Sequence, residues 1–209
     1  MQTLSCPSCG ANVNFVSKAS VFAVCSYCKS SLVRQGIDLE AVGKIAELSD
    51  DLTPIQIGTT FTFENENFDV IGRMKVAYTD GFWNEWFTVG SKGRLGWLVE
   101  AQGFWGMCFP CLDIVIPDQA GMAPGKSVDF GMLGYFQVED VHKVKCVYSE
   151  GELPVNAVQG RESLSVDLTG EKGAMATIEY AERERRVFCG AYQDFDLFQF
   201  KNLRAIDGW

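Results

Sequence analysis

The sequence predicts a mainly β protein, and three observations support this fold class. From Ile57 onward, short segments alternate apolar and polar residues in the manner of half-buried strands. The 21 glycines recur at turn-like positions, and strongly helical runs are scarce. Near the N-terminus, two pairs of cysteines have the spacing of a small metal-binding β module. Apolar residues make up 47% of the chain, with 15 Phe and 5 Trp, which is enough for a sizeable core.

The two cysteine pairs are Cys6-Pro-Ser-Cys9 and Cys25-Ser-Tyr-Cys28, and fifteen residues separate them. Each pair places two sulfurs within reach of one ion, and two pairs complete a closed tetrahedral site. The sequence therefore predicts a zinc ribbon over residues 1–36, in which Cys6, Cys9, Cys25 and Cys28 hold one structural Zn²⁺. Because protein ligands fill all four positions, no coordination site stays open for catalysis.

Residues 37–54 are predicted to form a short helical linker. Asp38 can act as an N-cap, and Leu39, Val42, Ile45 and Leu48 approximate a helical stripe. Beyond the linker, the predicted strands fall into two series, one in residues 55–120 and one in residues 121–209. They cover residues 59–63, 68–77, 83–89, 95–100, 103–109 and 113–116, then 127–130, 135–139, 143–149, 163–168, 174–180 and 186–189.

The two series echo each other. Gly58-x4-Phe63 followed by Phe68-Asp-Val70 returns as Gly125-x4-Phe130 followed by Phe136-Gln-Val138. Two interpretations stay open for the antiparallel body. It is either a pair of duplicated small barrel-like (SH3-like) units or one compact domain over residues 55–209. In the second case the echo arises because antiparallel strands and turns repeat a few common sequence patterns.

Charge and cysteine content restrict the partners and the compartment. The net charge is −9, yet residues 1–36 carry +3, so the remaining residues carry −12. An acidic body repels phosphate backbones, which argues against nucleic acid. No apolar run approaches the roughly 20 residues that cross a bilayer, so no transmembrane segment is expected. Eight cysteines without an export signal indicate metal ligands and buried thiols in a reducing compartment, so we expect a cytoplasmic protein.

Short motifs along the body carry a family resemblance. They are Gly58-Thr-x-Phe61, Phe68-x-Val-Ile-Gly-Arg73, Trp83-Asn-Glu-Trp86, Gly96-Trp-Leu98, Gly151-Glu-Leu-Pro154, Asp167-Leu and Val187-Phe-x-Gly190. With them, residues 55–200 resemble the bacterial family known only as domain of unknown function 4178, whose members often carry an N-terminal zinc ribbon. The resemblance implies a mainly β fold without an assigned activity. It also implies a gene neighbourhood shared with small membrane proteins and polyamine-synthesis enzymes, and so a role in membrane or polyamine-linked stress.

Trp83-Asn84-Glu85-Trp86 is the most unusual local sequence. In a strand, Trp83, Glu85 and Phe87 share one face and Asn84 and Trp86 share the other. A carboxylate among aromatics would be desolvated, which raises its pKa and suits it to general acid catalysis.

Three interpretations of Glu85 stay open. With Glu152 it would form a hydrolase-like carboxylate pair, or it pairs with a strand neighbour such as Arg73 or Lys75. The third interpretation is a binding site, in which Glu85 belongs to an acidic aromatic pocket for an amine or a basic peptide. The pocket would be made by Trp83, Glu85, Trp86, Trp97, Tyr148 and Glu152.

The remaining cysteines offer a third C-x-x-C, Cys108-Phe-Pro-Cys111. Redox motifs of this spacing lie at a helix N-terminus, whereas a strand-like segment follows here. Cys146 and Cys189 would complete a secondary thiol cluster able to hold a second zinc, but buried thiols are the favoured interpretation. The sequence has one histidine, His142, and no phosphate-binding loop, dinucleotide fingerprint or nucleophile elbow, which argues against an enzyme.

The leading hypothesis is therefore a non-enzymatic zinc-binding adaptor or binding module that works in an assembly with another protein. Two alternatives remain. One is a sensor of polyamines or other cations that uses the acidic aromatic pocket. The other is a hydrolase-type enzyme that uses Glu85 and Glu152.

Overall fold

The computed structural model describes residues 1–45, 52–182 and 184–206. Within them the secondary structure is almost entirely β, with fifteen strands and four 3-10 helices of three or four residues. The prediction of a mainly β fold is confirmed. In this described part of the chain, no helix has the length and apolar character needed to cross a membrane.

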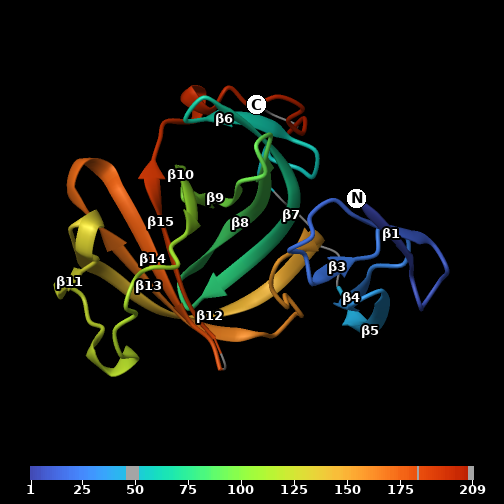
Figure 1. Cartoon of the computed structure of the whole chain (residues 1–209), viewed down its shortest axis with the longest axis horizontal. Helices are drawn as coiled ribbons and strands as arrows, with labels where there is room; N and C mark the ends of the chain where they lie inside the picture. Colours follow the sequence, from blue (N-terminus) through green and yellow to red (C-terminus); the bar gives the residue numbers. More distant parts are fainter. Residues whose placement is uncertain (46–51, 183, 207–209) are drawn as a thin grey trace.

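Eight antiparallel strands close into a barrel (Figure 1). Along the wall they follow the order β7-β8-β9-β10-β15-β14-β13-β12, and β12 pairs with β7 to close it. Closure leaves no unpaired strand edge in the wall. The barrel strands are β7 (Glu66–Tyr78), β8 (Gly81–Gly90), β9 (Leu95–Ala101), β10 (Phe104–Pro110), β12 (Tyr135–Leu153), β13 (Glu162–Thr169), β14 (Ala174–Tyr180) and β15 (Arg185–Tyr192).

Side chains alternate between the inside and the outside of the barrel, as strand geometry requires. On β8, Trp83 and Glu85 line the interior cavity and Phe87 joins the inner core, whereas Trp86 packs in a cluster on the outer face. The alternation predicted for residues 83–87 is therefore confirmed. Among the predicted strands, residues 113–116 form none.

Both halves of the barrel wall are also covered from outside. Over β7 to β10, Ile55, β6 (Thr60–Phe63) and the 3-10 helix η4 (Phe195–Phe198) form an aromatic layer. The other half, β12 to β15, is covered by the segment with η1 (Gln119–Gly121), β11 (Ser127–Asp129) and η2 (Gly131–Leu133). The last short helix, η3 (Glu171–Gly173), joins β13 to β14. Each fully buried Phe in these layers contributes roughly 1.5–3 kcal/mol.

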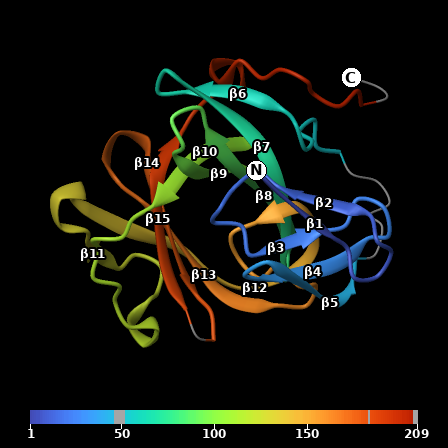
Figure 2. The ribbon, with the colours of Figure 1, turned by 45° about the vertical axis from the view of Figure 1, so that its right-hand side comes forward.

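The N-terminal region extends the barrel sheet (Figure 2). Its hairpin of β1 (Gln2–Ser5) and β2 (Asn12–Phe15) is a separate two-stranded sheet, while β3 (Phe22–Val24), β4 (Ser30–Gln35) and β5 (Asp38–Lys44) continue from the end of β12. In the register, Phe22 lies opposite Leu153. Phe22 is fully buried in the same core cluster as Val76 and Val144 of the barrel interior. The ribbon and the barrel therefore share one core.

The predicted linker helix is wrong over Asp38–Lys44, which form strand β5. Gly36, at a φ of 65°, makes the tight turn that lets Asp38 pair with Gln35 of β4. Pairing with β4 satisfies the backbone of this segment, and this long-range contact outweighs a weak helical pattern. The end of the predicted helix, residues 46–49, lies outside the described residues.

One closed barrel takes the place of the two separate SH3-like barrels among the predicted alternatives, and each predicted unit supplies four of its strands. The sequence echo nevertheless has a structural counterpart. The amide of Gly58 donates to Val70 O at 2.8 Å, and the amide of Gly125 donates to Val138 O at 2.8 Å. β6 thus lies on β7 as β11 lies on β12. The halves complete each other through β7–β12 and β10–β15, so neither closes into a barrel of its own.

Candidate metal site and barrel cavity

The four cysteines predicted to bind a metal lie in two turns with the same backbone hydrogen bond. The amide of Gly10 donates to Cys6 O at 2.8 Å, and the amide of Lys29 donates to Cys25 O at 3.0 Å. This turn points the two sulfurs of each pair toward a common centre. Packing of Val13, Phe15 and Leu32 behind the cysteines holds the two turns together.

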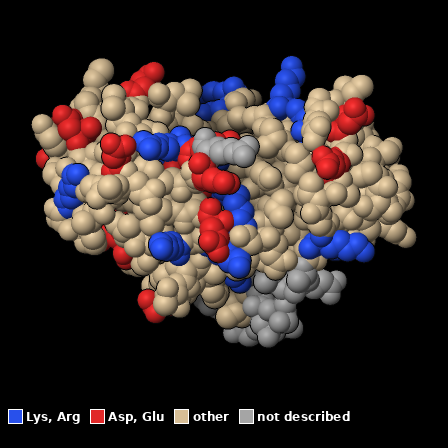
Figure 3. All heavy atoms as spheres, turned by 90° about the horizontal axis from the view of Figure 1, so that it is seen from below, with Lys and Arg blue, Asp and Glu red and all other residues tan. Residues whose placement is uncertain are grey.

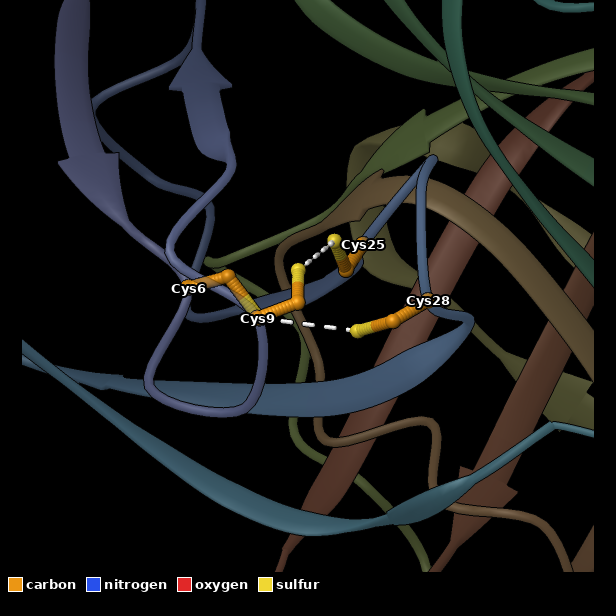
Figure 4. A group of neighbouring side chains, drawn as sticks. All are labelled: Cys6, Cys9, Cys25 and Cys28. Carbon is orange, nitrogen blue, oxygen red and sulfur yellow. Dashed lines mark hydrogen bonds between the residues drawn. The ribbon is translucent and has the colours of Figure 1, made fainter.

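The four predicted sulfurs do gather, all within 4.8 Å of one another (Figure 4). Sγ of Cys6 lies 3.7 Å from Sγ of Cys28, and Sγ of Cys9 lies 3.7 Å from Sγ of Cys25. A tetrahedral ion with metal–sulfur bonds of about 2.3 Å places its ligands about 3.8 Å apart, so the cluster fits one such ion. Four protein ligands would leave such an ion no open position, which is the arrangement of structural metal sites.

The barrel encloses a cavity of about 540 Å³. Its two walls differ in chemistry. Strands β7 to β10 supply mainly apolar and aromatic side chains, among them Met74, Trp83 and Trp97. Strands β12 to β15 supply mainly polar ones, among them Ser165 and Thr177. Phe82 and Phe104, both more than half exposed at the start of β8 and β10, mark the end where the cavity meets solvent.

Glu85 is the one carboxylate on the aromatic wall. Its Oε1 accepts a 2.8 Å hydrogen bond from Nε1 of Trp83. Burial raises the pKa of Glu85 to about 7, with smaller contributions from the charges of Glu179 and Asp167. Burial also raises the pKa of Asp167 on the opposite wall, although hydrogen bonds from Thr177 and Ser165 oppose this. The cavity thus holds two acids whose ionisation is suppressed by desolvation.

The polar wall also carries an ion-pair network. Nη2 of Arg161 lies 2.7 Å from Oε1 of Glu179, and Nη1 of Arg186 lies 3.7 Å from Oε2 of the same carboxylate. Arg186 also contacts Glu184. These guanidiniums are therefore paired with carboxylates of their own sheet.

His142 lies in the cavity wall beside Asp140. Its Nε2 is 2.9 Å from Oδ2 of Asp140, and its ring lies 4.4 Å from the ring of Tyr78. The only histidine of the sequence is thus held by an aspartate and an aromatic ring.

The structure divides the predicted aromatic pocket. Trp83, Glu85 and Trp97 line the cavity, whereas Trp86, Tyr148 and Glu152 do not. Trp86 is fully buried outside the wall, where its Nε1 donates to Glu100 at 3.1 Å and the Arg73 guanidinium lies 4.6 Å from its ring. Tyr148 donates its hydroxyl to Glu150 at 3.2 Å.

Glu152 belongs to the joint between ribbon and barrel. Its Oε1 accepts a 2.6 Å hydrogen bond from the amide of Val16, and its Oε2 accepts a 3.2 Å hydrogen bond from the amide of Ser17. Glu85, by contrast, faces the cavity. The two carboxylates of the hydrolase hypothesis therefore do not converge on one site.

The secondary thiol cluster also separates. Cys108 and Cys146 line the cavity, whereas Cys111 and Cys189 pack against the outer cluster. Residues i and i+3 of an extended chain point to opposite faces, which divides Cys108 from Cys111. Burial raises the pKa of Cys146 to about 12 and raises those of Cys108 and Cys189 well above the usual range. Such thiols are poor nucleophiles. In the described part of the chain, Cys6, Cys9, Cys25 and Cys28 form the only cluster suited to a metal.

Sequence reasoning missed the polar wall. Its alternation was readable, because Ser163, Ser165 and Asp167 occupy every second position of one strand. The partners Glu179, Arg161 and Arg186 meet through the pairing of neighbouring strands, in which Glu179 of β14 lies opposite Arg186 of β15. On the face in Figure 3, acidic and basic side chains lie interspersed on the outer surface.

Comparison with known proteins gives one match. A family model described as Domain of unknown function (DUF4178) matches residues 56–194. The match includes all eight barrel strands, and only Ile55 and η4 of the outer layers lie beyond it. No curated protein and no solved structure matches the chain.

Proposed function

The chain belongs to the DUF4178 family, for which no activity is described. We propose that it is a non-enzymatic binding module whose barrel holds a small organic molecule. The barrel cavity of about 540 Å³, which meets solvent at one end, carries this proposal. Small-molecule sites commonly measure several hundred Å³, and eight-stranded barrels are wide enough for one small ligand. An aromatic wall facing a hydrogen-bonding wall suits a ligand with one apolar and one polar side.

The absence of catalytic machinery is part of the proposal. It is supported by the separation of Glu85 from Glu152, by the high pKa values of the barrel thiols and by the closed coordination of the cysteine cluster. These features argue against a hydrolase that uses Glu85 and Glu152.

We propose Zn²⁺ as the ion of the ribbon, because four thiolates at tetrahedral spacing are its usual structural ligands. Its role is to hold β3, which continues the sheet of β12. Metal analysis of the purified protein is expected to give one zinc per chain. Iron in place of zinc, or no bound metal, would contradict this assignment.

Binding in the barrel can be tested with N-phenyl-1-naphthylamine, a neutral apolar dye that fluoresces in dry pockets. The wild-type protein is expected to raise its fluorescence in a saturable manner. Ala101→Phe and Val99→Trp, which add bulk to the cavity lining, are expected to abolish this signal. The matched control Val42→Trp adds the same bulk on the outer, exposed strand β5 and is expected to retain it.

Two results would overturn the binding proposal. One is a wild-type protein that gives no saturable signal. The other is equal dye binding by filled variants that still melt at the wild-type temperature, because the dye would then lie outside the barrel.

An adaptor role is a second candidate, favoured by apolar side chains on the surface. Met132 is fully exposed and Leu133 and Tyr135 are more than half exposed around η2, while Leu112 and Val115 are each 90% exposed in the preceding loop. Native mass spectrometry of protein purified gently from its host is expected to show a bound protein. Met132→Ser combined with Leu133→Ser is expected to lose that partner, and a bare monomer in both samples would contradict this role.

A further inference from the structure

Two carboxyl groups that line the cavity, those of Glu85 and Asp167, form no salt bridge with any described residue. Glu85 receives one hydrogen bond, from the indole of Trp83. Asp167 receives hydrogen bonds from the hydroxyls of Thr177, at 2.9 Å, and Ser165, at 3.4 Å. These neutral donors leave lone pairs on both carboxyl groups without a strong partner.

Arg161 and Arg186 form no salt bridge with either acid, because both guanidiniums pair with other carboxylates. Arg161 lies 2.7 Å from Glu179, and Arg186 contacts both Glu179 and Glu184. Two guanidiniums thus face two carboxylates, and this network is neutral by itself. Ionised Glu85 and Asp167 would add negative charge to a largely desolvated space, which is unfavourable, and the charges of Arg161 and His142 offset it only in part.

We propose that the barrel cavity binds an organic ammonium ion, with its cationic head at Glu85 and Asp167 and its apolar body against the aromatic wall. The inference rests on the proposed binding function and names the ligand class. A bound cation would place a positive charge beside the two carboxylates, which form no salt bridge within the described residues. The rings of Trp83, Trp97 and Tyr78 would add cation–π attraction and apolar contact. The cavity volume suits an amine the size of an aryl-alkylamine rather than a peptide.

Protonation of the cavity is consistent with this ligand class. Glu85 has a pKa of about 7, raised by burial and by Glu179 and Asp167 and lowered by Trp83 and Arg161. The thiols Cys108 and Cys146 and the guanidinium of Arg186 also face it, and His142 and Asp140 act on Asp167. At pH 6, Glu85 is mostly protonated, so binding of an ammonium ion should release a proton.

Calorimetric titration of the full-length protein tests the proposal with ligands that share one skeleton. The probes are phenethylamine, phenethyl alcohol and phenylacetate, which are cationic, neutral and anionic at pH 8, with tryptamine, tryptophol and indole-3-acetate as a second set. The amines are expected to bind at least about tenfold more tightly than the neutral ligands, and the acids more weakly still. At pH 6, amine binding is expected to release protons, visible as a dependence of the heat on buffer ionisation enthalpy.

Variants locate the ammonium site. Glu85→Gln and Asp167→Asn keep the shape of the cavity and are expected to remove most of the preference for amines. Glu162→Gln removes an exposed carboxylate from the same strand as Asp167 and is expected to retain it.

The outcomes separate this inference from the function on which it rests. Equal binding of amine and alcohol, or an unchanged amine preference in Glu85→Gln, would overturn the ammonium site while the dye still reports a binding barrel. Tighter binding of the acids would also overturn it, in favour of an anion site at the arginines. If neither these ligands nor the dye binds, the binding function itself fails.

Discussion

The carboxylate of Glu152 on barrel strand β12 accepts a 2.6 Å hydrogen bond from the backbone amide of Val16 in the ribbon. A second amide, that of Ser17, lies 3.2 Å from the other carboxylate oxygen. Glu152 is only 4% exposed, so these two amides take the place of water as its hydrogen-bond partners. This side chain, predicted from sequence as part of a pocket, instead joins the two parts of the molecule.

Glu152→Ala should therefore weaken the joint. It leaves two amides without their acceptor, and we expect a loss of about 1–3 kcal/mol in the free energy of unfolding. Glu162→Ala removes an exposed carboxylate near the start of β13 and should change the same quantity by less than about 0.5 kcal/mol. Urea unfolding followed by tryptophan fluorescence measures both. Equal stability of the two variants would show that the Glu152 hydrogen bonds contribute nothing.

Removal of the metal should affect the barrel as well as the ribbon. Without an ion, the two cysteine turns lose their common centre, and Phe22 and Leu153 lose the support that keeps them in the shared core. Chelation, or Cys9→Ser, is expected to lower the melting temperature of the whole chain in a single transition. Near-ultraviolet circular dichroism should report the loss of order around the barrel tryptophans. An unchanged barrel signal in metal-free protein would contradict the shared core.

Glu85→Gln should stabilise the protein at pH 8 and have little effect below pH 4.5. The unfolded carboxyl ionises near pH 4.5, whereas the folded one does so near pH 7. Between these values the folded state binds more protons, so stability falls as the pH rises. Glutamine removes that fall, and we expect a gain of about 1–3 kcal/mol at pH 8. Urea unfolding at pH 4.5 and pH 8 checks the sign, with Glu162→Gln as the control. A loss of stability at pH 8 would mean that ionised Glu85 has a favourable partner in the ligand-free protein.

Gly190→Ala should be severely destabilising. A Cβ at position 190 would lie 1.8 Å from Met107 O on β10, so β15 and β10 would have to separate. We expect a loss of more than about 3 kcal/mol or failure to fold. Gly43→Ala on β5 meets no atom within 4 Å and should be nearly neutral. Thermal unfolding of both variants makes the comparison, and a well-folded Gly190→Ala protein would argue against this strand pairing.

Local patterns accounted for much of the fold. The spacing of Cys6, Cys9, Cys25 and Cys28 predicted one cluster, because two residues between cysteines place both sulfurs at one centre. Alternation over residues 83–87 predicted which face of β8 carries Glu85, because strand side chains alternate strictly. The prediction of a linker helix was wrong because it depended on a weak local pattern. Over residues 38–44 the local signal was weak, and pairing with β4 decided the conformation.

The cysteine cluster, the β class and the face that Glu85 shares with Trp83 could be predicted without a structure, because each follows from residue spacing along the chain. Tertiary structure alone decided that two series of strands make one barrel, that Glu152 joins the ribbon, and that Glu85 shares a cavity with Asp167 and Glu179. Closure depends on pairing β12 with β7 and β10 with β15, across some 70 to 85 residues. Packing of the whole chain selects such contacts, and no local periodicity encodes them.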